Sequence, residues 1–300
     1  MRLTEVPEPA PADGDLVIDV HHVSLNSGDL NDARSGRVPA GAVLGSDAAG
    51  VVSRRARDGG GPDAGTRVVA LAPGAFARRI AVPSAAVAEV PRSVDLAEAA
   101  ALPVAGLAAL RALRAAGPVL GRRVLVTGAS GGVGRFAVQL AARAGACVIA
   151  SVGSPGRGEG LAAIGADAVV IGLDGVDEAV DVVLDNVGGP QLVAAWELLA
   201  PGGSLQSIGW TSGEPAVFPP YATVGPAKSL SSFLNQGDAG SDLATLVRLL
   251  AEGSLSAEIG WRGPWERMPE AVEMLVGRRV NGKAVLDVAA GAAAPQGARR

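Results

Sequence analysis

The sequence predicts an α/β protein in which a mostly antiparallel β region is followed by a doubly wound parallel sheet. Three observations support this prediction. Short strand patterns separated by glycine- and proline-rich turns fill the first hundred residues. From residue 122 onward, strand and helix patterns alternate with a period of roughly 20 to 30 residues, as in βαβ units. Where the two regions meet, 122–134 reads RRVLVTGASGGVG, a buried strand that leads into a glycine turn.

Composition indicates a well-buried globular protein and limits its classes of function. Of the 300 residues, 48% are hydrophobic and 19% are charged, and the net charge is −4. The scattered Lys and Arg residues create no basic field, so no nucleic-acid partner is expected. No apolar run reaches the ~18 residues that span a bilayer, and Met1 does not open a secretion signal. We therefore expect no membrane partner and a cytoplasmic location, and the length fits two domains.

Cysteine and histidine are too scarce for the common metal centres. Cys147 is the only cysteine, and the apolar strand pattern around it predicts a packed thiol rather than a nucleophile. His21 and His22 are the only histidines, and neighbours in a strand point to opposite faces. The sequence therefore predicts no metal site, no intramolecular disulfide and no Ser-His-Asp triad.

The first hundred residues contain the predicted antiparallel strands. These lie at 16–24, 43–52, 67–71 and 76–82. Polar, turn-rich residues follow the first strand, with a short helix predicted over 29–34. Gly45 and Gly50 lie inside a strand pattern, where glycine marks a bulge or the close approach of another group. An alanine-rich helical pattern then begins at residue 96, is interrupted at Pro103 and ends at Gly117.

The remaining chain alternates between strand and helix. Strands are predicted at 124–126, 147–152, 168–171, 181–185, 204–209, 229–235 and 283–288, and helices at 135–144, 158–164, 190–199, 242–252 and 269–276. Polar or glycine residues follow the strands of the parallel sheet at their carboxyl ends, where open α/β sheets bind ligands. The tail 289–300 has no period and is expected to be disordered.

The glycine turn predicts an anion site. A helix entered from such a turn directs unpaired backbone N–H groups and the positive end of its dipole at the turn. Gly128, Gly131 and Gly134 form a variant of the G-x-G-x-x-G dinucleotide fingerprint. The strand before it and the helix after it favour a phosphate-binding turn over a glycine turn without a ligand.

Several segments together resemble the medium-chain dehydrogenase/reductase superfamily, in its zinc-free quinone oxidoreductase-like branch. They read VSLNSGDL from Val23, LGSDAAGVV from Leu44, LPVAGLAAL from Leu102, GASGGVG from Gly128, IGADAVV from Ile164, DNVGG from Asp185, LAPGGSL from Leu199 and GKAVLDV from Gly282. The resemblance implies a GroES-like catalytic domain at 1–103 and 257–300 and a Rossmann domain at 104–256. It also implies a cleft between them for NAD(P)H and substrate, and a homodimer through the Rossmann sheet edge near 229–235.

The resemblance also assigns cofactor residues. The pyrophosphate would be cradled by Ser130, Gly131, Gly132 and Val133, and the nicotinamide ribose would lie beside Asn186 and Val187. The carboxamide would meet Gly209, Trp210 and Thr211, and a closing contact would come from Lys283. After the second strand, no acid precedes Glu159 to hold a ribose 2′-OH, whereas Ser154 and Arg157 suit a 2′-phosphate. NADPH is therefore the predicted cofactor. A solvated surface arginine is the alternative for Arg157.

The expected chemistry is hydride transfer without zinc. The segments that hold zinc in other members of the superfamily offer no Cys or His here, which favours an electron-poor acceptor, a quinone or an α,β-unsaturated carbonyl. Asn26, Asp29 and Asp47 are the candidate catalytic residues. Asp29 and Asp47 also fit structural or capping roles. Two alternatives stay open: a non-catalytic NADPH-binding structural or regulatory protein, and a tailoring reductase of a biosynthetic pathway.

Overall fold

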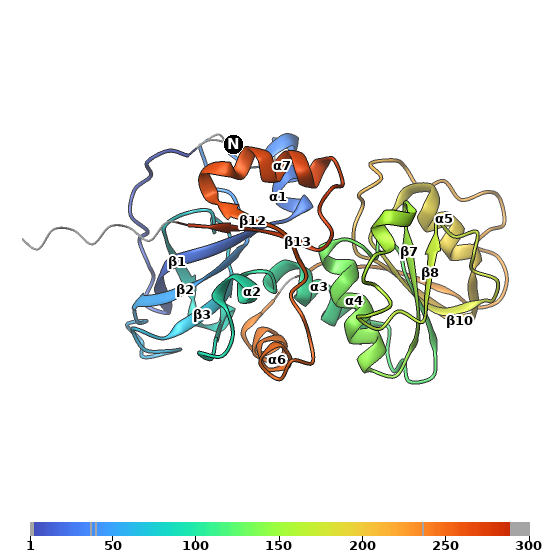
Figure 1. Ribbon diagram of the computed structural model, residues 1–300, viewed down its shortest axis with the longest axis horizontal. Helices are drawn as coiled ribbons and strands as arrows, with labels where there is room; N and C mark the ends of the chain where they lie inside the picture. Colours follow the sequence, from blue (N-terminus) through green and yellow to red (C-terminus); the bar gives the residue numbers. More distant parts are fainter. Residues whose placement is uncertain (1–2, 37, 40, 236, 289–300) are drawn as a thin grey trace, which may run out of the picture.

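The computed structural model describes residues 3–288 except 37, 40 and 236. Two sheets lie side by side, with α3 (Pro103–Ala115) and α4 (Gly132–Arg143) between them (Figure 1). One sheet has seven strands and is mostly antiparallel, and the other has six parallel strands. The predicted fold class is confirmed. The predicted domain boundaries stay a prediction, and the predicted disorder of the tail lies outside the described residues.

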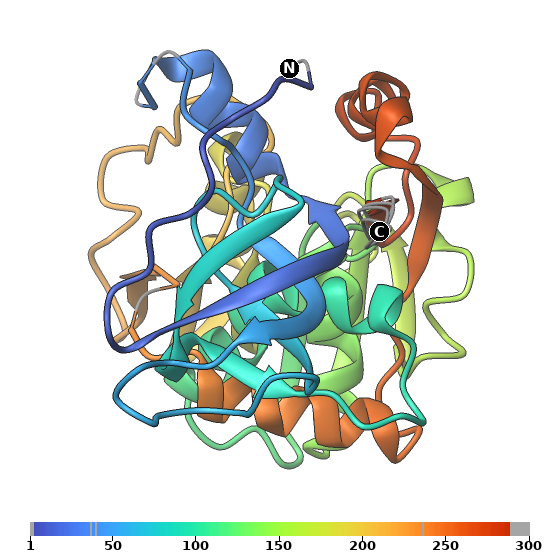
Figure 2. The ribbon, with the colours of Figure 1, turned by 90° about the vertical axis from the view of Figure 1, so that its left-hand side faces the viewer.

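The seven-stranded sheet takes strands from both ends of the chain. They are β1 (Asp15–Leu25), β2 (Asp47–Arg54), β3 (Arg67–Leu71), β4 (Arg79–Pro83), β5 (Val87–Glu89), β12 (Ile259–Pro264) and β13 (Lys283–Asp287). Their order is β12-β13-β1-β2-β3-β5, with β4 also paired to β1. Figure 2 views the molecule from the side of this sheet, with α1 (Ser27–Ser35) and α7 (Met268–Val276) at the top.

Two glycines in this region mark close approaches, as predicted. A Cβ atom at Gly50 would lie 2.0 Å from the carbonyl oxygen of Asp19 on β1. Gly45 has φ +96°, and a Cβ there would lie 2.3 Å from the Phe76 ring. The strand predicted over 43–52 begins only at Asp47, because the carbonyls of residues 44 and 45 accept hydrogen bonds from the 75–76 turn instead.

The strand order of the parallel sheet reverses at its middle strand β6 (Arg123–Val126). Its strands are β6 (Arg123–Val126), β7 (Cys147–Val152), β8 (Ala168–Ile171), β9 (Val180–Asp185), β10 (Leu199–Ser207) and β11 (Ser229–Ser232), in the order β11-β10-β9-β6-β7-β8. The chain builds outward from β6 to β8, then crosses to the other side of β6 and builds β9 to β11. Such a reversal places a ligand crevice at the carboxyl ends of β6 and β9.

Short helices connect and cover the sheets. They are α2 (Leu96–Ala100), α5 (Gly189–Glu197) and α6 (Gly240–Ala251), with 3₁₀ turns η1 (Ser84–Ala86), η2 (Pro155–Gly158) and η3 (Trp265–Arg267). One buried cluster joins the two sheets, because Ala49 and Val69 of the first pack with α2 and α3 against Val124 and Val126 of the second. None of the helices among the described residues has the length and apolar character needed to cross a membrane.

The helix predicted over 158–164 is wrong. The structure has the 3₁₀ turn η2 followed by hydrogen-bonded turns up to residue 165. The apolar residues Leu161 and Ile164 have helical spacing, but Gly160 between the ends of the segment has φ +77°, which is not helical. Glycine in a helix interior is also less favourable than alanine by about 1 kcal/mol, so Gly160 opposes the helix that this spacing predicts.

The prediction of a packed thiol at Cys147 is also wrong, because the side chain is exposed. Cys147 is the first residue of β7, at the amino end of the sheet, whereas Val148 and the residues after it enter the core. A strand pattern predicts the face on which a residue lies but not how far the core extends along the strand. The strands β5 and β12 were not predicted, since β5 has three residues and β12 contains glycine and proline.

Candidate functional site

The predicted glycine turn lies at the crevice, between β6 and α4. Gly128 takes up φ +60°, which side chains disfavour. A Cβ at Gly134 would lie 2.4 Å from the carbonyl oxygen of Gly128 and 2.6 Å from Cα of Ala129, so only glycine lets the helix close against the turn. Gly131 is the N-cap of α4, and a Cβ there would meet only the Gly128 oxygen, at 3.4 Å. The turn therefore leaves Gly131 open to a ligand.

The neighbouring Gly132 is covered by the other sheet domain. A Cβ at Gly132 would lie 2.7 Å from Cδ of Lys283, whose alkyl chain crosses the first turn of α4. The N–H of Gly282 donates to the carbonyl of Ser130 at 2.8 Å, and Gly131 and Gly282 form an isolated bridge. The two halves of the protein thus meet on the glycine turn.

Arg157 reaches from η2 to this turn. Its Nε donates to the hydroxyl of Ser130 at 2.8 Å, and its Nη2 donates to the carbonyl of Val280 at 3.4 Å. Its Nη1 is buried and has no acceptor in the described part of the chain. Burial lowers the pKa of Arg157, and the neighbouring cations Arg278 and Arg135 lower it further. An anion bound here would supply the missing acceptor and relieve this repulsion.

A second unpaired group lies at the carboxyl ends of β6 and β9. Asn186 is buried; its backbone N–H donates to the Thr127 hydroxyl at 3.0 Å and its Nδ2 to the Thr127 carbonyl at 2.9 Å. Its Oδ1 is buried without a donor among the residues that the structure describes. Buried amide oxygens are nearly always hydrogen-bonded, so a ligand hydroxyl or amide is the natural partner.

Asp185 organises the backbone beside Asn186. The Thr127 hydroxyl donates to one carboxylate oxygen at 2.5 Å, and the N–H of Gly188 donates to the other at 2.9 Å. Burial raises the pKa of Asp185 despite these bonds. Thr127 and Asp185 are site residues that sequence reasoning missed. The only sequence feature that could have indicated them is their position, since each lies where a strand of the parallel sheet ends.

The loop after β10, with the predicted residues Gly209, Trp210 and Thr211, packs on the same strand ends, and their contact with a carboxamide stays a prediction. The Thr211 hydroxyl donates to the carbonyl of Asn186 at 3.1 Å, and a Cβ at Gly209 would lie 3.0 Å from that oxygen. The Trp210 ring covers Gly188, where a Cβ would approach it to 2.5 Å, and its indole N–H donates to the Glu214 carbonyl. Trp210 is 48% exposed, so the residue is partly accessible.

Other predicted cofactor residues lie around the glycine turn. Ser130 is buried, Val133 is half-buried in the first turn of α4, and Val187 approaches Gly128. Ser154 is exposed and precedes η2. The roles assigned to these residues stay predictions.

The three predicted catalytic residues lie together in a buried polar cluster, which we define as Ser24, Asn26, Asp29, Ser46, Asp47 and Lys283. Asp47 accepts hydrogen bonds from Ser24 Oγ at 2.6 Å, Asn26 Nδ2 at 2.9 Å and Lys283 Nζ at 3.1 Å. Its other oxygen accepts from the N–H of Val104, at the start of α3. Asp47 is 0% exposed and supports these neighbouring residues, and its predicted catalytic role stays a prediction.

Asn26 and Asp29 close the N-terminal end of α1. Asp29 accepts from the backbone N–H of Asn26 at 3.0 Å and from Ser46 Oγ at 2.8 Å. Both hydrogens of the Asn26 amide point at carboxylates, those of Asp29 and Asp47. The prediction that Asn26 donates to a cofactor stays a prediction and requires one of these bonds to be exchanged.

The cluster predicts a pH dependence of stability. Burial, with the charge of Asp47 second, raises the pKa of Asp29 to about 6. The folded state then binds more protons than the unfolded state between about pH 4 and 6, so the free energy of unfolding falls as the pH rises through this window. Urea unfolding measures this: between pH 4.5 and 7, the free energy of unfolding of the wild type should fall by about 2 kcal/mol relative to that of the D29N variant, which does not titrate at this position. A difference that does not change with pH would contradict this assignment.

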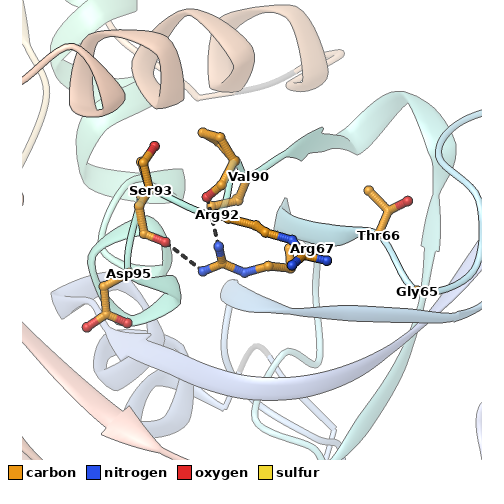
Figure 3. A pocket seen from close by; sticks show the side chains of 9 residues that line it. Gly65, Thr66, Arg67, Val90, Arg92, Ser93 and Asp95 are labelled. Carbon is orange, nitrogen blue, oxygen red and sulfur yellow. Dashed lines mark hydrogen bonds between the residues drawn. The ribbon is translucent and has the colours of Figure 1, made fainter.

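A separate hollow of about 820 Å³ lies between residues 65–67 and 90–95 of the seven-stranded sheet domain (Figure 3). Inside it, the guanidinium of Arg67 donates to the backbone carbonyls of Pro91 and Val94. Because these are internal bonds that hold a loop, the crevice with its two unpaired groups is the better candidate site.

The donor set of the described residues does not suit a metal. Among them, no three His, Cys, Asp or Glu side chains form a group that would hold a metal ion. In the polar cluster, the ammonium group of Lys283 already contacts Asp47. His22 binds Asp287 on β13. Zinc therefore does not fit the polar cluster.

Comparisons with known proteins agree with this architecture. Residues 12–92 match a model described as an alcohol dehydrogenase GroES-like domain, and residues 164–286 match one described as a zinc-binding dehydrogenase. Prostaglandin reductase-3 of Bos taurus is 30% identical over 95% of this chain and 84% of its own length. A highly reducing polyketide synthase of Arthrinium phaeospermum, apmlA, is 36% identical over 68% of this chain, which spans only 9% of that protein.

A solved structure is also similar along its whole length. The quinone oxidoreductase of Thermus thermophilus, whose structure was also determined in complex with NADPH, superimposes with a TM-score of 0.79. It is 29% identical, and the match covers 96% of each chain.

Proposed function

The chain belongs to the medium-chain dehydrogenase/reductase family, in its quinone oxidoreductase-like branch, and from this membership we propose an NADPH-dependent reductase that acts without zinc. The proposed acceptor is a quinone or the activated C=C bond of an α,β-unsaturated carbonyl. The single observation that carries the proposal is the pair of unpaired buried groups, Arg157 Nη1 and Asn186 Oδ1, at the glycine-turn crevice. Similar proteins named quinone oxidoreductase and prostaglandin reductase support it.

The residues of the crevice fit a dinucleotide phosphate. The start of α4, after its N-cap Gly131, offers backbone N–H groups and the positive end of a helix dipole to the pyrophosphate. Arg157 supplies a cation for a phosphate, and the Oδ1 atom of Asn186 would accept from a ribose hydroxyl. When bound, NADPH supplies the hydride, and the chain's residues bind and orient it and exclude water.

An electron-poor acceptor suits the rest of the cleft. Reduction of a simple carbonyl requires a metal ion or a proton donor at the carbonyl oxygen, and the polar cluster holds an ammonium group where a metal ion would need free ligands. A quinone or enone is already activated, so placing it against the cofactor is the main requirement. The aromatic face of Trp210 is suited to stack on a flat acceptor.

Titration and turnover test this proposal together. Fluorescence titration should show NADPH binding, and a panel of quinones and enones should accelerate NADPH oxidation above a protein-free control. Binding without oxidation of any acceptor would favour the non-catalytic alternative. Absence of NADPH binding would reject the proposal.

We further propose a homodimer through the outer edge of the parallel sheet. β11 is the terminal strand, and Leu230 on it is 43% exposed. Light scattering should give about twice the chain mass of 29.7 kDa. L230K places a charge on the edge and should yield monomers, whereas the control V276K, on exposed α7, should stay dimeric. A monomeric wild type would contradict the proposal.

A further inference from the structure

Lysine is almost absent from this chain, and one of its two lysines is buried. Lysine occurs only at 228 and 283, and the other basic residues of the 26 are arginine. Lys228 is half-buried and binds the backbone carbonyls of Trp196 and Glu197. Lys283 is 3% exposed. An ammonium group at 283 therefore stands out in a chain that otherwise uses guanidinium groups.

The ammonium group of Lys283 is bound on three sides. It donates to the Leu25 carbonyl at 3.0 Å, to Asn26 Oδ1, and to Asp47 Oδ2 at 3.1 Å. An ammonium nitrogen has three donors, so these acceptors satisfy it completely. A buried charge is tolerated only when it is paired and hydrogen-bonded in this way.

The alkyl chain of Lys283 lies against the glycine turn. It crosses Gly132, where a Cβ would come within 2.7 Å of Cδ. The backbone of Lys283 belongs to β13, which pairs with β1 so that Ala284 faces Leu25. One side chain therefore touches the glycine turn with its stem and the start of α1 with its head.

We infer that Lys283 is a positioning residue that holds the start of α1, with Asn26, at a fixed separation from the glycine turn. The sequence placed Lys283 as a closing cofactor contact, whereas its ammonium group points away from the turn into the polar cluster. The inference rests on the proposed function, because this separation is the gap between the substrate wall and the cofactor. A loss of alignment near 1 Å lowers turnover about 100-fold.

Two lysine-to-arginine variants form a matched test. K283R keeps the charge but replaces the compact ammonium with a planar, larger group that does not present donors to three converging acceptors. We expect kcat to fall about 100-fold while the Kd for NADPH changes less than about threefold. K228R should match the wild type in both. If K283R keeps wild-type kcat, or loses NADPH affinity as strongly as kcat, the inference is overturned.

A charge-neutral double variant covers the case in which K283R does not fold. K283M/D47N removes both members of the ion pair, so neither is left buried without the other. It should fold, retain NADPH affinity, and again lose kcat about 100-fold. A folded double variant with wild-type kcat would show that Lys283 serves stability alone.

Hydrogen exchange separates this inference from the proposed function. In K283M/D47N, the amides of α1 and of residues 130–134 should exchange at least about tenfold faster, while those of β9 and β10 should not change. This readout needs no turnover, so it decides the inference even if the wild type reduces no acceptor. Unchanged exchange in α1 would overturn it.

Discussion

Replacing Arg157 with alanine should weaken NADPH binding about 30-fold while changing NADH binding less than about threefold. The guanidinium is half-buried beside Ser130, and its Nη1 is unpaired among the described residues. Burial and the neighbouring cations Arg278 and Arg135 lower its pKa. A hydrogen bond to a charged group contributes about 2 kcal/mol, and the 2′-phosphate is the group that NADH lacks. Fluorescence titration of both cofactors measures the ratio directly.

The comparison of the two cofactors also tests where the guanidinium acts. Its bond to Ser130 places it at the glycine turn, near the predicted pyrophosphate, rather than on Ser154. Equal losses for NADPH and NADH would mean that it serves the pyrophosphate, and the predicted selection of the 2′-phosphate would be wrong. R143A is the control, because Arg143 is exposed at the far end of α4 and its replacement removes the same charge.

The parts of the site that could be predicted from sequence are local. The strand, turn and helix at 122–144 follow from glycine positions and apolar spacing within one segment, and the structure has them. Gly134 is required by atoms only five and six residues away, those of Ala129 and Gly128. Such contacts are encoded in adjacent sequence, so the pattern is sufficient.

The direction of Lys283 could not be predicted, because it depends on strand pairing between the two ends of the chain. The register of β13 on β1 carries its stem over Gly132 and its ammonium group to Leu25, 258 residues away. The bond from Arg157 to Ser130 likewise crosses from η2 to the turn. The three candidate catalytic residues were found in two separate motifs, and the lysine that joins Asn26 to Asp47 was assigned to the cofactor.

The glycine turn gives the largest expected effect on stability. G134A would place a Cβ 2.4 Å from the Gly128 carbonyl and 2.6 Å from Ala129 Cα, both of them backbone atoms that do not move without displacing α4. Such an overlap should lower the free energy of unfolding by about 3 kcal/mol and Tm by roughly 6 to 10 °C. Thermal unfolding measures the change, and NADPH binding should be lost with it.

G131A separates the shape of the turn from its ligand. Gly131 has φ −78°, and a Cβ there would be 3.4 Å from the Gly128 oxygen, so the variant should fold with a Tm near that of the wild type. The added methyl group would stand where a phosphate must approach the backbone, so NADPH affinity should fall about tenfold or more. If G131A binds NADPH normally, the phosphate does not lie on this turn, and if G134A keeps both Tm and affinity, the close approach of α4 does not constrain it.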